Sequence, residues 1–176
     1  MSAPLVLRGT SVRLRSTAAA DRDALVAIRS TDEVRRRWHG DDLVAEFDED
    51  LADDEVVRLT IEDSSGNIVG MIQYHEEDDP QYRHAGIDVY IDPAVHRRGY
   101  ASDAIRAVVE HLIIDRGHHR LTIDPAADNT AAIAVYDKVG FRPVGRMRQY
   151  ELRADGTWAD GLLMELLADD WPPPPR

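Results

Sequence analysis

An amphipathic helix between two strands is the feature that most constrains the fold of this chain. Residues 100–116 carry apolar side chains at helical spacing, and Gly117 follows as a stop signal. A β-rich run at residues 82–91 precedes this helix, and a short one at residues 120–124 follows it. A strand, a helix and a second strand in this order predict a parallel, right-handed crossover within one sheet.

The remaining segments add strands of mostly antiparallel type. Two β-rich runs, 56–61 and 68–74, flank turn residues 64–67 and predict a hairpin. Further strands are expected at 12–15, 142–153 and 162–167, and further helices at 24–28, 41–55 and between Asn129 and Gly140. We therefore predict an α/β fold with a central mixed, mostly antiparallel twisted sheet and helices on both faces.

The length of 176 residues predicts one domain, residues 1–171, followed by a flexible proline-rich tail at 172–176. The chain contains no cysteine, which excludes disulfides, cysteine-bound zinc and thiol nucleophiles. Its longest apolar run is far shorter than the roughly 18 residues that a membrane span needs. We expect a cytoplasmic protein that does not bind membranes.

The chain is strongly acidic, with 33 Asp and Glu residues against 21 Lys and Arg residues and a formal net charge of −12. This charge disfavours nucleic acid as a partner and favours a cation. Nine acids and no base lie between residues 41 and 55, where Leu43, Phe47 and Leu51 still form an apolar stripe. Genome composition or a high-salt habitat would produce the same charge, so the charge alone does not name a substrate.

The hexapeptide at residues 96–101 is the segment best suited to binding a ligand. Gly99 and Ala101 allow close approach to the backbone, and the N–H groups at a helix start favour an anion. Arg97 and Arg98 add positive charge, so a diphosphate fits this segment. The motif G-x-G-x-x-G and the phosphate-loop motif are both absent. An ordinary helix start with solvated arginines is the alternative interpretation.

This hexapeptide resembles the cofactor signature of the GNAT superfamily, whose members are N-acetyltransferases that use acetyl-coenzyme A (acetyl-CoA). His96 departs from the Gln or Arg that is usual at the first position, which concerns one side-chain contact and leaves the backbone unaffected. A second signature follows at Asn129, Ala132, Ile133, Tyr136, Lys138, Gly140 and Phe141. The resemblance spans about residues 56–168 and implies the GNAT fold, with acetyl-CoA as the acetyl donor.

The resemblance also implies a set of donor-binding residues and a direct transfer in a ternary complex without a metal. These residues are Val89, Tyr90, Ile91, His96, Arg97, Arg98, Gly99, Tyr100, Ala101 and Asn129. Backbone N–H groups near Val89–Ile91 would polarise the thioester carbonyl. Asn129 would contact the pantetheine arm, although a helix N-cap would explain this residue equally well.

A closer resemblance is to aminoglycoside 6′-N-acetyltransferases. It rests on Gly86–Asp88, on Asp124 and Pro125, and on Trp38 followed by Gly40. In that family the two aspartates line the acceptor pocket and the tryptophan covers it, which implies a small cationic amine as the acceptor. We also consider a homodimer as the assembly. Protein N-terminal acetyltransferases of the ribosomal-protein type share the cofactor motifs, and a non-catalytic coenzyme A sensor needs only the cofactor half, so both alternatives stay open.

Three side chains are candidates for catalysis. The resemblance implies that Tyr136 protonates the departing thiolate, whereas a buried aromatic that packs on the sheet is the alternative. Asp88 lies inside an apolar strand, so we expect burial, a raised pKa and a role as the base or water-orienting group. Asp124 precedes Pro125 and is expected to be more exposed and to hold the substrate cation. Both aspartates are expected to face one cleft at the strand ends.

Overall fold

The computed structural model describes residues 5–171, so the predicted tail at 172–176 lies outside the described residues. The chain forms two compact units. Of the described residues, the first unit contains 5–75 and Asp88–Val108, and the second contains Glu76–Ile87 and 109–171. Within residues 5–171, no helix is long and apolar enough to cross a membrane.

Within residues 5–171, the sheet contains eight strands in the spatial order β1-β2-β3-β4-β5-β6-β8-β7. Their bounds are β1 Val6–Arg8, β2 Val12–Ser16, β3 Val56–Asp63, β4 Ile68–Glu77, β5 His84–Ile91, β6 Arg120–Ile123, β7 Arg142–Leu152 and β8 Trp158–Leu167. The pairs β1/β2, β2/β3, β3/β4, β6/β8 and β7/β8 are antiparallel. The pair β5/β6 is parallel, with Ala85 opposite Leu121. The predicted mixed, mostly antiparallel sheet and its parallel crossover are confirmed.

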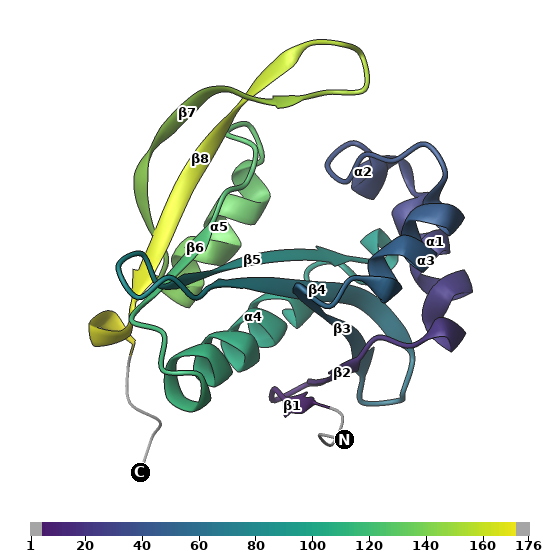
Figure 1. The fold of residues 1–176 in the computed structure, drawn as a ribbon. Helices are drawn as coiled ribbons and strands as arrows, with labels where there is room; N and C mark the ends of the chain where they lie inside the picture. Colours follow the sequence, from purple (N-terminus) through teal and green to yellow (C-terminus); the bar gives the residue numbers. More distant parts are fainter. Residues whose placement is uncertain (1–4, 172–176) are drawn as a thin grey trace. The chain divides into compact units, whose positions relative to one another are not determined.

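In the first unit, helices cover both faces of the strands. Helices α1 (Arg22–Arg29), α2 (Asp32–Arg35) and α3 (Leu43–Ala52) lie on one face, and α4 (Tyr100–Glu110) lies on the other (Figure 1). The buried cluster on the α1–α3 face comprises Leu25, Ile28, Val34, Phe47, Met71 and Tyr90. This core supports the last residues of β5, where the sequence predicts donor binding.

Gly70 lets β4 approach the end of β5 closely. A Cβ atom at this position would lie 2.2 Å from the carbonyl oxygen of Tyr90, which no real side chain can do. On the same stretch, the N–H group of Asp92 donates to the carbonyl oxygen of Val69 at 2.8 Å. Gly70 therefore fixes the backbone path of Tyr90 relative to β4.

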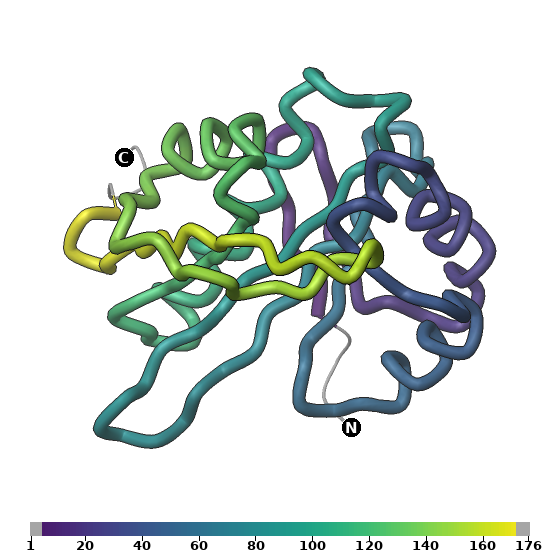
Figure 2. The backbone as a smooth tube through the Cα atoms, turned by 90° about the horizontal axis from the view of Figure 1, so that it is seen from above, coloured from purple at the N-terminus to yellow at the C-terminus, as the bar shows by residue number. Residues whose placement is uncertain are grey.

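In the second unit, helix α5 (Thr130–Val139) has the ends that the sequence predicts. The side-chain oxygen of Asn129 accepts a hydrogen bond from the Ala132 N–H group at 3.3 Å, and Gly140 ends the helix with φ of 131°. Strands β7 and β8 run side by side as a long hairpin after α5 (Figure 2). The buried side chains of this unit include Leu121, Ile123, Phe141, Met164 and Leu166.

Several boundaries differ from the prediction. The three-residue strand β1 was not predicted, β5 begins at His84 and not at residue 82, and β8 begins at Trp158, four residues before the predicted start. Helix α4 ends at Glu110, and the chain continues as a π-helical turn over His111–Asp115. Leu51, assigned to the apolar stripe of the acidic helix, is 38% exposed because it lies in the last turn of α3.

Candidate functional site

The loop that precedes helix α4 has a backbone conformation that suits the binding of an anion. After β5, the Asp92 carboxylate caps the short 3-10 turn Pro93–Val95. Arg97 and Gly99 then adopt positive φ angles of 64° and 83°, a conformation that is rare for non-glycine residues. The amide of Asp103 donates to the carbonyl oxygen of Gly99 at 3.0 Å. The N–H groups before it have no acceptor within the helix and are available to a ligand.

Gly99 and its neighbours fit the diphosphate of a coenzyme. A Cβ atom at Gly99 would meet no atom within 4 Å, so the space above this residue is open. Arg97 and Arg98 are exposed, and neither forms an ion pair within the described part of the chain. His96 is held by the loop itself, with Nε2 3.1 Å from the carbonyl oxygen of Ile91 and Nδ1 3.3 Å from the Glu33 carboxylate. The segment thus combines backbone donors, open space and two cationic side chains.

Asp103, one turn into α4, fixes the position of this helix start. Its carboxylate accepts hydrogen bonds from the N–H groups of Thr10, Ser11 and Val12 and from the Ser11 hydroxyl, at 2.7 to 3.1 Å. Gly9 is packed so closely that a Cβ atom there would lie 2.5 Å from a carboxylate oxygen. Burial alone would raise the pKa of Asp103, but these hydrogen bonds outweigh it and lower the pKa below its ordinary value.

We expect Asp103→Asn to lower the free energy of unfolding at pH 7 by about 1–3 kcal/mol, because charge-assisted hydrogen bonds are replaced by weaker ones. The folded-state pKa is lowered, so the stabilisation is present above the unfolded pKa of about 4 and is lost as the pH falls through the folded value. Urea unfolding of both proteins between pH 3 and 7 measures this difference. Asp23→Asn, at a fully exposed side chain, is the control. A difference that does not shrink at low pH would contradict the argument.

Asp88 and Tyr90 are two residues apart on β5, so their side chains lie on the same side of this strand. For Tyr90 this is the face covered by α1–α3, opposite to α4. The Gln73 side chain on β4 donates a hydrogen bond to Asp88 at 3.4 Å. Asp88 is partly exposed, so the prediction that this residue is buried is wrong. Its neighbour on β4 is the polar Gln73 and not an apolar side chain. Asp124 is partly exposed as well, so the predicted difference in burial between the two aspartates is absent.

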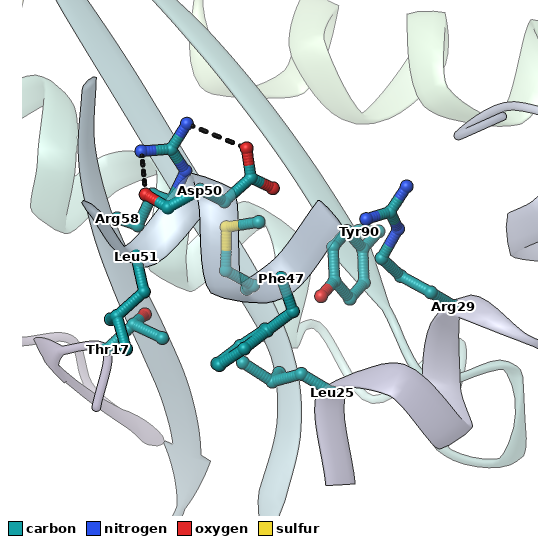
Figure 3. A pocket seen from close by; sticks show the side chains of 9 residues that line it. Thr17, Leu25, Arg29, Phe47, Asp50, Leu51, Arg58 and Tyr90 are labelled. Atoms are coloured by element: carbon teal, nitrogen blue, oxygen red, sulfur yellow. Dashed lines mark hydrogen bonds and ion pairs between the residues drawn. The ribbon is translucent and has the colours of Figure 1, made fainter. Parts of the chain in front are cut away.

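A small cavity of about 20 Å³ lies beside Tyr90, between α1, α3 and the strands. Figure 3 shows eight of its lining residues with labels. Thr17, Leu25, Arg29, Phe47, Asp50, Leu51, Arg58, Met71 and Tyr90 line it. Two of these residues are arginines with nearly buried side chains, 10% exposed for Arg29 and 11% for Arg58. The surface of the cavity is nonetheless mostly apolar.

Beside the cavity, the rings of Trp38 and Tyr90 contact each other edge to face, with ring centroids 4.9 Å apart. The Arg29 guanidinium lies 6.0 Å from the Trp38 ring centroid. Burial raises the pKa of the Tyr90 hydroxyl far above its ordinary value, while Arg29 lowers it and Asp50 raises it further. The Tyr90 hydroxyl therefore stays protonated near neutral pH and acts as a donor.

The other predicted site residues belong to the second unit. Tyr136 is buried, and its ring packs edge-to-face against Phe141 at a centroid distance of 6.4 Å. Asn129 uses its side-chain oxygen for the helix cap, which leaves its NH₂ group for a ligand. The Tyr150 hydroxyl donates a hydrogen bond to the Asp124 carboxylate.

The first unit brings together Val89–Ile91, the segment 96–101, Asp88 and Trp38. Since Asp124, Asn129 and Tyr136 belong to the second unit, the shared cleft of Asp88 and Asp124 stays a prediction. Four polar residues of these surroundings were not predicted from the sequence, namely Arg29, Arg58, Asp103 and Tyr150. In the sequence each of them is a charged or polar residue within an amphipathic helix or strand. Such residues usually lie in solvent, so nothing in the sequence singled them out. No cluster of three or more potential metal ligands occurs within residues 5–171.

Comparison with known proteins identifies the class that this fold and helix start define. The family model described as "Acetyltransferase (GNAT) domain" matches residues 11–142. The chain therefore belongs to the GNAT family of acetyltransferases.

Individual relatives differ in their acceptors. The chain is 29% identical over 119 residues to the L-amino acid N-acetyltransferase AaaT of Escherichia coli, covering 67% of this chain and 73% of that protein. It is 35% identical over 82 residues to the ribosomal protein bS18-alanine N-acetyltransferase of E. coli, covering 45% of this chain and 52% of that protein. The crystal structure of spermidine N-acetyltransferase from Vibrio cholerae, with CoA and spermine, has a TM-score of 0.79 at 18% identity and covers 92% of this chain and 98% of that one.

Proposed function

We propose that this protein is an acetyl-CoA dependent N-acetyltransferase that acts on a primary amine of a small polycationic acceptor of the aminoglycoside kind. The open backbone cradle at Gly99, flanked by Arg97 and Arg98, carries the donor half of the proposal. The diphosphate would accept hydrogen bonds from the N–H groups at the start of α4. Membership of the GNAT family supports the acyl transfer.

In the proposed reaction the neutral amine attacks the thioester carbonyl carbon, an amide bond forms, and the C–S bond breaks to release the thiolate of coenzyme A. The N–H groups of Val89–Ile91 polarise the carbonyl, and Tyr136 donates a proton to the sulfur. The nitrogen loses a second proton as the amide forms, and this proton restores the Tyr136 hydroxyl through solvent. Asp88 accepts the proton that the ammonium must lose, directly or through water, and Asp124 holds the substrate cation. The absence of cysteine excludes an acyl-thiol intermediate on the enzyme.

The acidic segment around α3 supports a cationic acceptor. Four of its nine acids form ion pairs with arginine: Glu46 with Arg29, Asp48 with Arg22, and Asp50 and Asp53 with Arg58. The other five are exposed and form no ion pair within residues 5–171, namely Asp41, Asp42, Glu49, Asp54 and Glu55. These carboxylates would raise the local concentration of a polycation. The spermidine N-acetyltransferase of similar fold was crystallised with spermine, also a polycation.

We expect kcat/KM for a multiply charged amine such as kanamycin to fall about tenfold between 50 and 500 mM salt, because screening weakens the attraction. The KM for acetyl-CoA, an anion, should respond differently. The triple variant Glu49→Gln, Asp54→Asn, Glu55→Gln should show a flatter salt dependence with kanamycin. Steady-state kinetics measure all three effects. An acceptor KM that does not change with salt would mean that the acidic surface plays no part in binding.

An acetyltransferase for protein N-termini is the second candidate, and the ribosomal protein bS18-alanine N-acetyltransferase among the relatives favours it. Parallel assays with kanamycin, spermidine and a short peptide with an N-terminal alanine separate the two candidates. Exclusive turnover of the peptide would overturn the polycation proposal. Turnover of any amine excludes a non-catalytic coenzyme A sensor.

A further inference from the structure

Strand β7 carries a bulge at residues 148–150. These three residues lie opposite the single β8 residue Asp160, because the pairing of the two strands shifts between Met147 and Glu151. Gln149, in the middle of the bulge, has φ of 50°. Its N–H group donates a hydrogen bond to the Asp160 carboxylate at 2.8 Å, so the facing strand holds the bulge in place.

The bulge turns the side chain of Tyr150 to the face of the hairpin on which Met147 lies. Residues three apart in a regular strand point to opposite faces. Here both side chains lie against Gly161, where a Cβ atom would be 2.8 Å from the Tyr150 ring and 3.0 Å from Met147. Bulges redirect side chains in this way. The Tyr150 ring thus occupies the space that a side chain at Gly161 would need.

The segment that begins at Asp124 is fixed against the same part of β8. Ala126 lies opposite Gly161 in an antiparallel bridge. Backbone hydrogen bonds of 2.8 Å join Pro125 and Ala127 to β8 on either side of this bridge. The backbone after Asp124 is therefore held against the glycine that the Tyr150 ring contacts.

This arrangement lets the Tyr150 hydroxyl donate a hydrogen bond to Oδ2 of Asp124. Within the described residues, Oδ1 of Asp124 accepts no hydrogen bond. A donor on one oxygen restricts the rotation of the carboxylate, so Oδ1 keeps a defined direction. Tyr150 is 50% exposed and Asp124 is partly exposed. Because water could replace this hydrogen bond, it adds little to the stability of the fold.

The bulge also requires a strained backbone. Of the non-glycine residues among 5–171, two have positive φ, namely Arg97 in the proposed donor loop and Gln149. Such strain is often found at ligand-binding and active sites, where the surrounding structure maintains it. A strained bulge that produces one hydrogen bond near the surface is therefore better explained by the placement of Asp124 than by stability.

We propose that Tyr150 is a positioning residue for acceptor binding: its hydroxyl holds Oδ2 of Asp124, so that Oδ1 is directed to the ammonium group of the acceptor. This inference rests on the proposed function, which assigns Asp124 to the substrate cation. Tyr150 itself takes no part in proton transfer. Loss of its hydroxyl therefore weakens acceptor binding and leaves the chemical step unchanged.

The variant Tyr150→Phe removes the hydroxyl and keeps the ring over Gly161. We expect it to raise the KM for kanamycin about fivefold, the effect of one net hydrogen bond, while kcat and the KM for acetyl-CoA stay unchanged. Release of coenzyme A is followed with a thiol reagent, which has no background from this cysteine-free chain. Tyr82→Phe is the control, because Tyr82 belongs to the same unit and is 71% exposed. It should keep the wild-type constants.

A double-mutant cycle tests whether Tyr150 acts through Asp124. Asp124→Ala removes both carboxylate oxygens, so Tyr150→Phe should have no further effect on the KM for kanamycin in this background. An effect that persists in the Asp124→Ala background would overturn the assignment of Tyr150, as would an unchanged or lower KM in Tyr150→Phe alone. Absence of turnover with every amine would instead overturn the proposed function, and this assignment with it.

Discussion

Replacement of Gly99 by valine is expected to raise the dissociation constant for acetyl-CoA at least about 100-fold, a loss equivalent to two or more hydrogen bonds. Gly99 has φ of 83°, which a β-branched residue adopts only with strain. The added side chain would stand in the open space above the helix start, where the diphosphate is proposed to bind. Isothermal titration calorimetry of the folded variant measures the affinity.

Gly156→Val is the matched control for this substitution. Gly156 has φ of 82° in the β7–β8 turn, and a Cβ atom there would also meet no atom within 4 Å. Both variants therefore carry similar backbone strain, but only the change at Gly99 alters the proposed cradle. Thermal unfolding of both variants shows whether the strain itself unfolds the protein. A folded Gly99→Val protein with wild-type affinity for acetyl-CoA would show that this loop is an ordinary helix start and does not bind the diphosphate.

Elements with strong local signals were predicted well. The hairpin of β3 and β4 forms around residues 64–67 as expected, because two β-rich runs flank a cluster of turn residues. Helix α5 has a side-chain cap at Asn129 and a positive φ at Gly140. These features depend on residues that are close in sequence, so local preferences determine them.

Elements that depend on distant partners were predicted poorly. The first residues of β8, Trp158–Gly161, have no apolar alternation, and they become a strand because β7 pairs with them, with Trp158 opposite Leu152. Strand β1 has three residues and exists through its pairing with β2. Tertiary contacts override weak local preference in both cases.

The same reason explains which site residues were missed. Arg29 follows the apolar positions of α1, where an arginine at the end of a helix usually lies in solvent. It is buried because α3 places Glu46 against it and Trp38 lies over it. The loop at residues 96–101 could be predicted because backbone chemistry and glycine define it locally. The neighbours of Arg29 are set by the packing of α1 against α3 and against the residues that precede α3.

Tyr136→Phe is expected to lower kcat about 100-fold with little change in either KM, because general acid catalysis typically contributes at least that factor. The substitution keeps the ring that packs against Phe141, so the fold of the second unit should be preserved. The substitution removes the proposed proton donor to the thiolate. Steady-state kinetics with acetyl-CoA and kanamycin measure the change, and circular dichroism checks the fold.

Asp88→Asn tests the proposed base, and its pH profile can be compared with that of Tyr136→Phe, which tests the proposed acid. If Asp88 accepts the proton of the amine, this variant should lower kcat and abolish the acidic limb of the pH profile, which Tyr136→Phe should leave in place. Asp124→Asn should instead raise the acceptor KM and keep the profile, since Asp124 is proposed to hold the cation. Because both aspartates are partly exposed, burial does not distinguish them, and the pH profile is the deciding measurement. An Asp88→Asn enzyme with wild-type kcat and an unchanged profile would end the assignment of Asp88 as the base.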